Sequence, residues 1–146
     1  MMSKESFYVE ITSNYDRFWR YNLAVTCGCF DDLGKGEDNP RKDFVAAEDT
    51  IAPAGSNLTA PPQGYPAHRK LSFTTVGCDY LLMYLYVIPH TLPEDRELEN
   101  CDPFGLQVKV TRGDSIVLDR EFHVNCWSGA SIELRLPAAN TIGTAR

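Results

Sequence analysis

The sequence predicts an all-β protein, a single-domain antiparallel β-sandwich of about seven strands. Apolar and polar residues alternate with period two in seven stretches of the chain, which is the pattern of half-buried strands. No long stretch has the 3.6-residue period of an amphipathic helix, and a length of 146 residues suits one domain. We therefore treat residues 1–146 as one sandwich domain.

The first three predicted strands place apolar side chains at every second residue. They cover residues 7–12, 21–29 and 71–73. The apolar sets are Phe7, Val9 and Ile11, then Tyr21, Leu23, Val25, Cys27 and Cys29, and then Leu71 and Phe73. Successive side chains of a strand point to opposite faces, so each of these strands has one face suited to a core.

The later strands include one with a different pattern. Residues 80–88 are apolar throughout, which predicts a central strand with both faces covered. Residues 106–111, 116–124 and 131–136 alternate again, and residues 112–115 read as a hairpin turn. Arg120 stands at an apolar position, which a β-bulge or an edge strand would explain.

Two long segments, residues 31–69 and 89–103, interrupt the strands and carry the charge. The first has seven acids against four bases and the second five against one, in a chain of net charge -6. Asn39 and Pro40 predict a short helix that runs through Asp49. Pro93 predicts another short helix over the acidic residues that follow it.

Strand direction then predicts how the connections are distributed. If every consecutive strand reverses, the two long segments and the turn at residues 125–130 share one end of the sandwich. The links at residues 13–20 and 112–115 share the other end. The two acidic segments would thus form one acidic pole.

Composition excludes several kinds of partner. A net charge of -6 without clustered Lys and Arg argues against nucleic acid. The longest apolar run has nine residues, too few for a helix that spans a membrane. No secretory signal is visible, and an odd number of cysteines, five, is typical of free thiols in a reducing compartment. These observations predict a cytoplasmic protein.

Two regions are predicted to bind a protein partner. Acidic side chains at Glu94, Asp95, Glu97 and Glu99 could dock a basic protein by charge complementarity, or simply form a solvated surface. The acidic pole could alternatively bind calcium or a glycan. The aromatic and arginine residues of the 13–20 link have the composition of interface hot spots, or could instead close the core. The candidates in this second group are Arg17, Phe18, Trp19 and Arg20, to which we add Trp127 in the last turn.

Metal and catalytic sites are not predicted. Cys27, Cys29, His123 and Cys126 lack the spacing of a zinc site, and buried cysteines act as small apolar residues. His68 and His90 could meet near a nucleophile such as Cys101 or Ser128, but no hydrolase motif accompanies them. We therefore expect a non-catalytic protein–protein interaction module without a cofactor. It would be a subunit or adaptor of a larger assembly or a homo-oligomer, and an unrecognised hydrolase is a further alternative.

Overall fold

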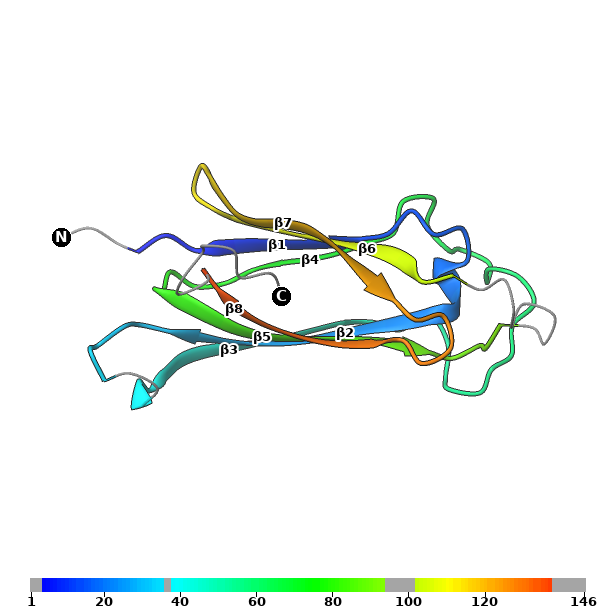
Figure 1. Cartoon of the computed structure of the whole chain (residues 1–146), viewed down its shortest axis with the longest axis horizontal. Coiled ribbons are helices and arrows are strands. Elements are labelled where there is room, and N and C mark those ends of the chain that lie inside the picture. Colours follow the sequence, from blue (N-terminus) through cyan, green and yellow to red (C-terminus); the bar gives the residue numbers. More distant parts are fainter. Residues whose placement is uncertain (1–3, 36–37, 94–101, 138–146) are drawn as a thin grey trace.

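The computed structural model describes residues 4–35, 38–93 and 102–137 and forms a β-sandwich of two antiparallel sheets (Figure 1). Its elements in chain order are β1 (Phe7–Thr12), the 3-10 helix η1 (Phe18–Arg20), β2 (Tyr21–Phe30), β3 (Arg41–Asp49), β4 (Lys70–Thr74), β5 (Tyr80–Pro89), β6 (Phe104–Arg112), β7 (Ser115–Val124) and β8 (Ala130–Leu136). The predicted fold class is confirmed, and each of the seven predicted strands corresponds to one of these eight.

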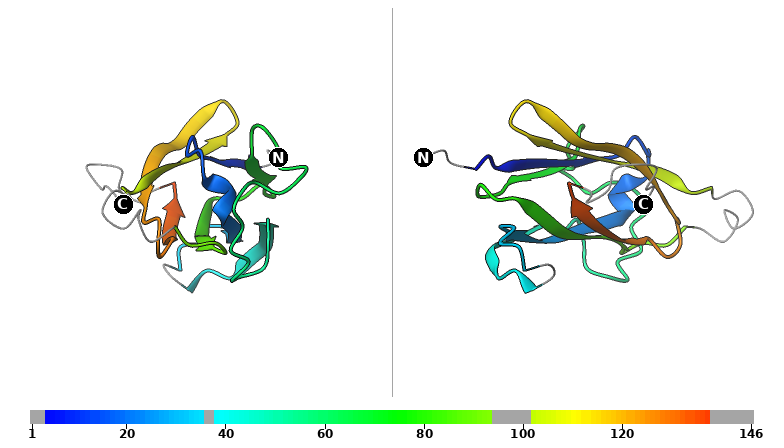
Figure 2. Two further views of the ribbon diagram at one scale, coloured as in Figure 1. Left: turned by 90° about the vertical axis from the view of Figure 1, so that its right-hand side faces the viewer. Right: turned by 60° about the vertical axis from the view of Figure 1, so that its left-hand side comes forward.

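Each sheet has four strands. Sheet A has the order β4-β1-β6-β7 and sheet B the order β3-β2-β5-β8, and every pairing is antiparallel. The sheets stack face to face, as the end-on view in Figure 2 shows. Their inner faces form one apolar core, in which Ile11, Leu23 and Leu85 are fully buried. The apolar residues at alternate positions of the strands are thus the ones buried between the two sheets.

The helix predicted for residues 40–49 is wrong, because residues 41–49 form the edge strand β3. Val45 and Ala47 lie on its inner face, pack against the core and pair with β2. Asn39 does not cap a helix: its side chain accepts from Leu33 N at 3.1 Å and donates to the Tyr80 hydroxyl at 3.2 Å. Exposed charges along β3 are typical of an edge strand, where they discourage pairing with other chains.

The additional strand also overturns the predicted acidic pole. Because β3 crosses the sandwich, the described residues before it (31–35 and 38–40) lie at the opposite end from residues 50–69 (Figure 1). We call the two ends of the sandwich the hairpin end, after the β6–β7 hairpin turn, and the η1 end, after the 3-10 helix. The hairpin end contains residues 31–35, 38–40, 75–79 and 113–114. The η1 end contains residues 13–20, 50–69, 90–93 and 125–129.

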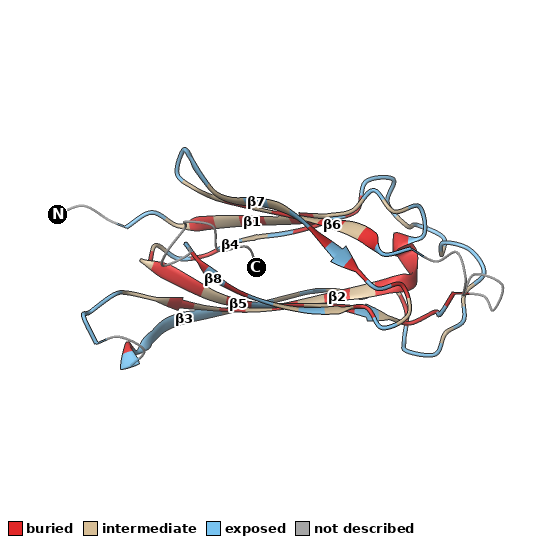
Figure 3. Ribbon diagram, in the orientation of Figure 1, coloured by how far each residue is buried: buried red, intermediate tan, exposed pale blue. Residues whose placement is uncertain are grey.

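The prediction that β5 is covered on both faces is wrong for the described chain. β5 is a central strand, and Leu81, Met83, Leu85 and Val87 are buried on its inner face. Its outer residues are partly exposed, with Tyr84 at 38% and Ile88 at 44% of full exposure (Figure 3). The outer face of sheet B therefore presents apolar side chains to solvent.

Arg120 has the edge position that the sequence allowed for. It lies on β7, an edge strand of sheet A, and its guanidinium carbon is 4.5 Å from the ring centre of Phe122. The stem of an arginine can cover apolar surface while its head stays wet, so an inward-facing position at an edge is tolerated.

The four cysteines among the described residues divide into two groups. Cys27, Cys29 and Cys78 are free and buried in the core. Burial raises the pKa of Cys27 to about 12 and that of Cys29 to about 11. Cys126 is disulfide-bonded, so the expectation of free thiols throughout is wrong at that residue.

Candidate functional site

The predicted hot-spot residues of the 13–20 link are mostly buried. Phe18, Trp19 and Arg20 form η1 and are each at most 6% exposed. The Phe18 ring packs edge-on against Phe104, with ring centres 6.1 Å apart. This burial fits the alternative in which they close the end of the sandwich, and it leaves little of them for a partner; Arg17 is exposed.

The other predicted partner residues do not form one surface with them. Glu94, Asp95, Glu97 and Glu99 lie outside the described residues. Trp127 is half-buried in the β7–β8 turn, which Asn125 braces by accepting hydrogen bonds from the backbone N–H groups of residues 127 and 128.

Acidic residues of the hairpin end are engaged by lysines. Asp31 lies 3.2 Å from Lys4 Nζ and 3.3 Å from Lys42 Nζ, and Lys4 also donates to Asp79 at 2.9 Å. The hydrogen bond from Lys4 lowers the pKa of Asp79.

Within residues 4–35, 38–93 and 102–137, no group of three or more His, Cys, Asp or Glu is placed to hold a metal ion. In the same ranges, no helix has the length and apolar character needed to cross a membrane.

The outer side of sheet B carries the most distinctive surface. We call it the tyrosine face, and it comprises Ala24, Thr26, Gly28 and Phe30 of β2, Phe44 and Ala46 of β3, and Leu82, Tyr84, Tyr86 and Ile88 of β5. An antiparallel sheet with one wet face normally alternates apolar-in with polar-out. Large apolar residues at outward positions are thus a departure that solvation does not explain.

Strand register aligns these side chains in rows across the sheet. The central row reads Ala46, Thr26, Tyr84 and Glu133 from β3 to β8. The row on the hairpin side reads Phe44, Gly28, Leu82 and Arg135, and the row on the η1 side reads Glu48, Ala24, Tyr86 and Ser131. Apolar residues therefore occupy the middle of the face, and charges stand at its two edges.

Several rings of the face are held by neighbours. The Phe30 ring stacks on Tyr80 with centres 5.1 Å apart, and the Arg135 guanidinium lies 4.1 Å from the centre of the Tyr80 ring. Arg41 lies 4.9 Å from the centre of the Phe44 ring. Contacts of this kind fix aromatic side chains before any partner arrives, which lowers the entropy lost on binding.

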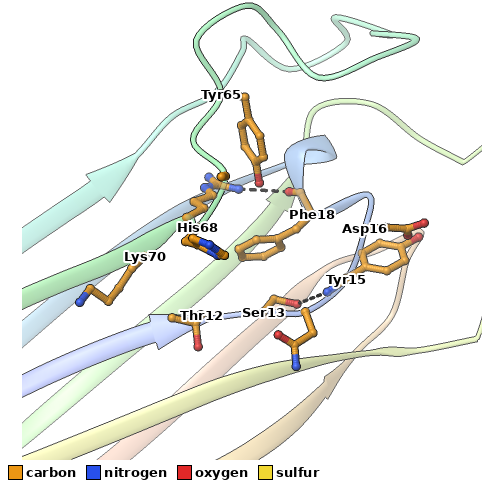
Figure 4. Close-up of a pocket in the computed structure, with 11 residues that line it drawn as sticks. Thr12, Ser13, Tyr15, Asp16, Phe18, Tyr65, His68 and Lys70 are labelled. Carbon is orange, nitrogen blue, oxygen red and sulfur yellow. Dashed lines mark hydrogen bonds between the residues drawn. The ribbon is translucent and has the colours of Figure 1, made fainter.

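A second candidate is a cavity of about 610 Å³ at the η1 end (Figure 4). It lies between the link that follows β1 and the segment that precedes β4. Its lining residues are Thr12, Ser13, Asn14, Tyr15, Asp16, Phe18, Tyr65, Ala67, His68, Arg69 and Lys70. Three of its polar side chains are used in the fold. The Ser13 hydroxyl donates to Gly105 O at 2.6 Å, Lys70 pairs with Glu10 at 3.1 Å, and Arg69 is buried.

Arg69 links three segments at the η1 end through hydrogen bonds. Its Nε donates to the Asp49 carboxylate at 2.7 Å, and its terminal nitrogens donate to Asp49 O at 3.0 Å and Phe18 O at 3.1 Å. The guanidinium also lies 4.7 Å from the centre of the Phe18 ring. Arg69 thus ties the end of β3 and η1 to the start of β4, and its groups are engaged in structure.

His90 has a similar structural role at the η1 end. Its Nε2–H donates to Trp19 O at 2.7 Å, and Nδ1 accepts from the Thr91 hydroxyl at 2.8 Å in the tautomer that satisfies both atoms. Thr91 Oγ1 in turn accepts from Leu58 N at 2.9 Å. Burial lowers the pKa of His90. His68 lines the cavity, whereas His90 is committed to this buried chain of hydrogen bonds.

The tyrosine face is the candidate surface that sequence reasoning missed. Its signal is the run of apolar residues at 80–88, which the pattern alone assigns to a strand covered on both sides.

Comparison with known proteins assigns no function to this chain. No family model and no curated protein matches this chain. Among solved structures, the chain is similar to a DUF4425 family protein from Bacteroides ovatus, with 11% identity, a TM-score of 0.44, and 94% of this chain and 99% of that chain covered.

Proposed function

We propose that this chain is a non-catalytic protein–protein interaction module, a subunit or adaptor of a larger assembly, and that the tyrosine face is its docking surface. The observation that carries the proposal is the exposure of apolar side chains along the outer side of β5, the central strand of sheet B. The proposal moves the contact region away from η1, which is buried.

The residue types suit a protein partner. Tyrosine offers a large contact area with few rotatable bonds, and aromatic residues are enriched where protein interfaces are most tightly packed. Fully burying an exposed large apolar side chain contributes about 1.5–3 kcal/mol, and half-exposed residues contribute a fraction of that. Tyr84, Ile88 and Phe44, the last at 46% exposure, would therefore supply most of the binding energy.

The surroundings of the face also suit docking. Glu48 lies at the β3 edge, and Glu133 and Arg135 lie at the β8 edge, all exposed. An apolar centre with a charged rim is the usual anatomy of a protein interface. Charges at a rim mainly set association rate and partner choice, so they select among partners that the apolar centre could hold.

Two predictions from the sequence stay predictions beside this proposal. Docking of a basic protein on the acidic residues 94–99 is compatible with a second contact outside the described residues. A cytoplasmic location is the other, and the disulfide at Cys126 counts against it, because such bonds persist mainly in oxidising compartments.

Photo-crosslinking tests the docking surface directly. A benzoylphenylalanine at position 84 is irradiated in the cells that make the protein, and the matched control carries it at Ile116, an exposed apolar position of sheet A (61%). We expect one discrete protein adduct at position 84, lost when Tyr86→Arg is added, and none at position 116. The proposal fails if position 84 gives no adduct, or gives the same adducts as position 116.

A further inference from the structure

The tyrosine face consists of a ridge beside a valley. Outward positions of β5 hold the large residues Leu82, Tyr84, Tyr86 and Ile88, and their direct partners on β2 are Gly28, Thr26, Ala24 and Asn22. Four large side chains thus stand next to four small or short ones, and the register ends at the hairpin side with the stacked pair Phe30 and Tyr80. At the hairpin side the Phe30 ring leans over Gly28, since a Cβ built there would meet its Cε1 at 2.9 Å. The open part of the valley is therefore Ala24 and Thr26.

We infer that the occupant of the tyrosine face is a second copy of this chain, related by a two-fold axis that runs parallel to the strands between β2 and β5. This rests on the proposed function and names its partner. Such an axis places β2 of one copy over β5 of the other in the same row. Each ridge then enters the other copy's valley, so that Tyr84 meets Thr26 and Tyr86 meets Ala24. A two-fold interface must be self-complementary, and Tyr84 and Tyr86 beside an open valley at Thr26 and Ala24 meet that condition.

Charge placement supports the same axis. β3 of one copy then faces β8 of the other, which sets Glu133 opposite Ala46, Arg135 opposite Phe44 and Glu48 opposite Ser131. No two like charges are direct partners in these rows, although Arg41, which lies 4.9 Å from the centre of the Phe44 ring, stands near Arg135 of the other copy. A two-fold axis perpendicular to the strands through the central row would instead put Glu133 opposite its own copy and ridge against ridge. That arrangement costs both repulsion and packing.

The size of the face sets the expected strength. Four strands and about seven residues along each give a surface of roughly 19 Å by 23 Å from the usual strand spacing and rise. Two such surfaces give about 900 Å², which is below the range of about 1,200–2,000 Å² that stable specific interfaces bury and is typical of a weak contact. Stacked twisted sheets align at about 30°, so contact is best near the Thr26/Tyr84 row and weakens toward the corners. We therefore expect a dimer with a dissociation constant on the order of 10 µM.

Sedimentation equilibrium of the purified full chain tests this inference, with protein concentrations that span the expected constant by a factor of about ten on each side. We expect a monomer–dimer equilibrium. Tyr84→Arg, which puts a charge on the ridge, and Thr26→Trp, which fills the valley, should each weaken dimerisation at least tenfold. Ile116→Arg, which puts the same charge on an exposed position of sheet A, should leave it unchanged. Thermal melting shows that each variant is folded, and the two disruptive variants lie on different strands, so one can replace the other.

The outcomes separate this inference from the proposed function. A chain that stays monomeric at the highest concentration overturns the dimer, and so does a dimer that none of these variants weakens. Larger oligomers overturn the two-fold axis. The crosslink at position 84 decides separately whether the face docks a protein. An adduct with the mass of two chains, found together with the monomer–dimer equilibrium, supports both claims. An adduct of a different mass that Tyr86→Arg abolishes supports only the proposed function.

Discussion

Arg69 and Lys70 are neighbours in the sequence with opposite surroundings, and replacing each with alanine tests the account of the η1 end. The Arg69 side chain is 2% exposed and makes three hydrogen bonds to Asp49 and Phe18. Removing one partner of a buried pair costs about 3–5 kcal/mol. Asp49 is 32% exposed and can recover water, so we expect about 2–4 kcal/mol for Arg69→Ala, mainly from carbonyl groups left without donors.

Lys70→Ala is the matched control. Lys70 pairs with Glu10 at 3.1 Å, but its side chain is 46% exposed, and surface pairs of this kind contribute little to stability because solvent screens them. Arg69→Met separates packing from polar contacts, because it keeps the apolar stem against Phe18 and removes every donor. Urea unfolding at constant m-value gives the free energies of unfolding. The reasoning is refuted if Arg69→Ala and Lys70→Ala cost the same, or if Arg69→Met is as stable as the wild type.

Three further predictions concern the core and its titratable groups. Leu85→Ala should cost about 2–5 kcal/mol in urea unfolding, and a loss below about half a kcal/mol would contradict its burial. Burial lowers the pKa of His90, so the unfolded chain takes up a proton at a higher pH than the folded chain does. The contribution of His90 to the free energy of unfolding should therefore be complete above about pH 6.5 and decrease below it. His90→Gln should make the melting temperature less dependent on pH between about pH 7.5 and 5.5. Cys27, Cys29 and Cys78 should resist iodoacetamide at about pH 8 in the native protein and react in denaturant, as mass spectrometry would show; rapid native alkylation would contradict the raised thiol pKa values.

Alternation in the sequence located the strands that have a clear inner face, and it failed at β3. That strand carries Arg41, Lys42, Asp43, Glu48 and Asp49, so only Val45 and Ala47 contribute to the core. The local signals of Asn39 and Pro40 favoured a helix, whereas pairing with β2 decided the outcome. An edge strand has its state set by its neighbour more than by its own pattern.

One missed strand was enough to misplace the loops. Each connection is assigned to an end of the sandwich by counting strand reversals. The additional strand β3 therefore puts residues 31–35 and 38–40 at the opposite end from residues 50–69. The contact between Arg69 and Phe18, far apart in sequence, could not have been expected from the uncorrected order.

The tyrosine face was visible in the sequence only as an excess of apolar residues on one strand. In a sandwich of two layers, each strand has a single inner face, so Tyr84 and Tyr86 had to point outward once eight strands were divided between two sheets. The valley could not be predicted, because it depends on Thr26 and Ala24 being the partners of those tyrosines. Such pairing comes from tertiary structure.

Hydroxyl-radical footprinting tests most directly whether the tyrosine face docks a protein. The oxidation of Tyr84, Tyr86 and Ile88 is measured by mass spectrometry inside intact cells and in the purified protein diluted well below micromolar concentration, with Ile116 as the internal reference. The account predicts that oxidation of the three β5 residues falls several-fold in cells while that of Ile116 stays constant. Equal oxidation of the β5 residues in both samples would contradict it.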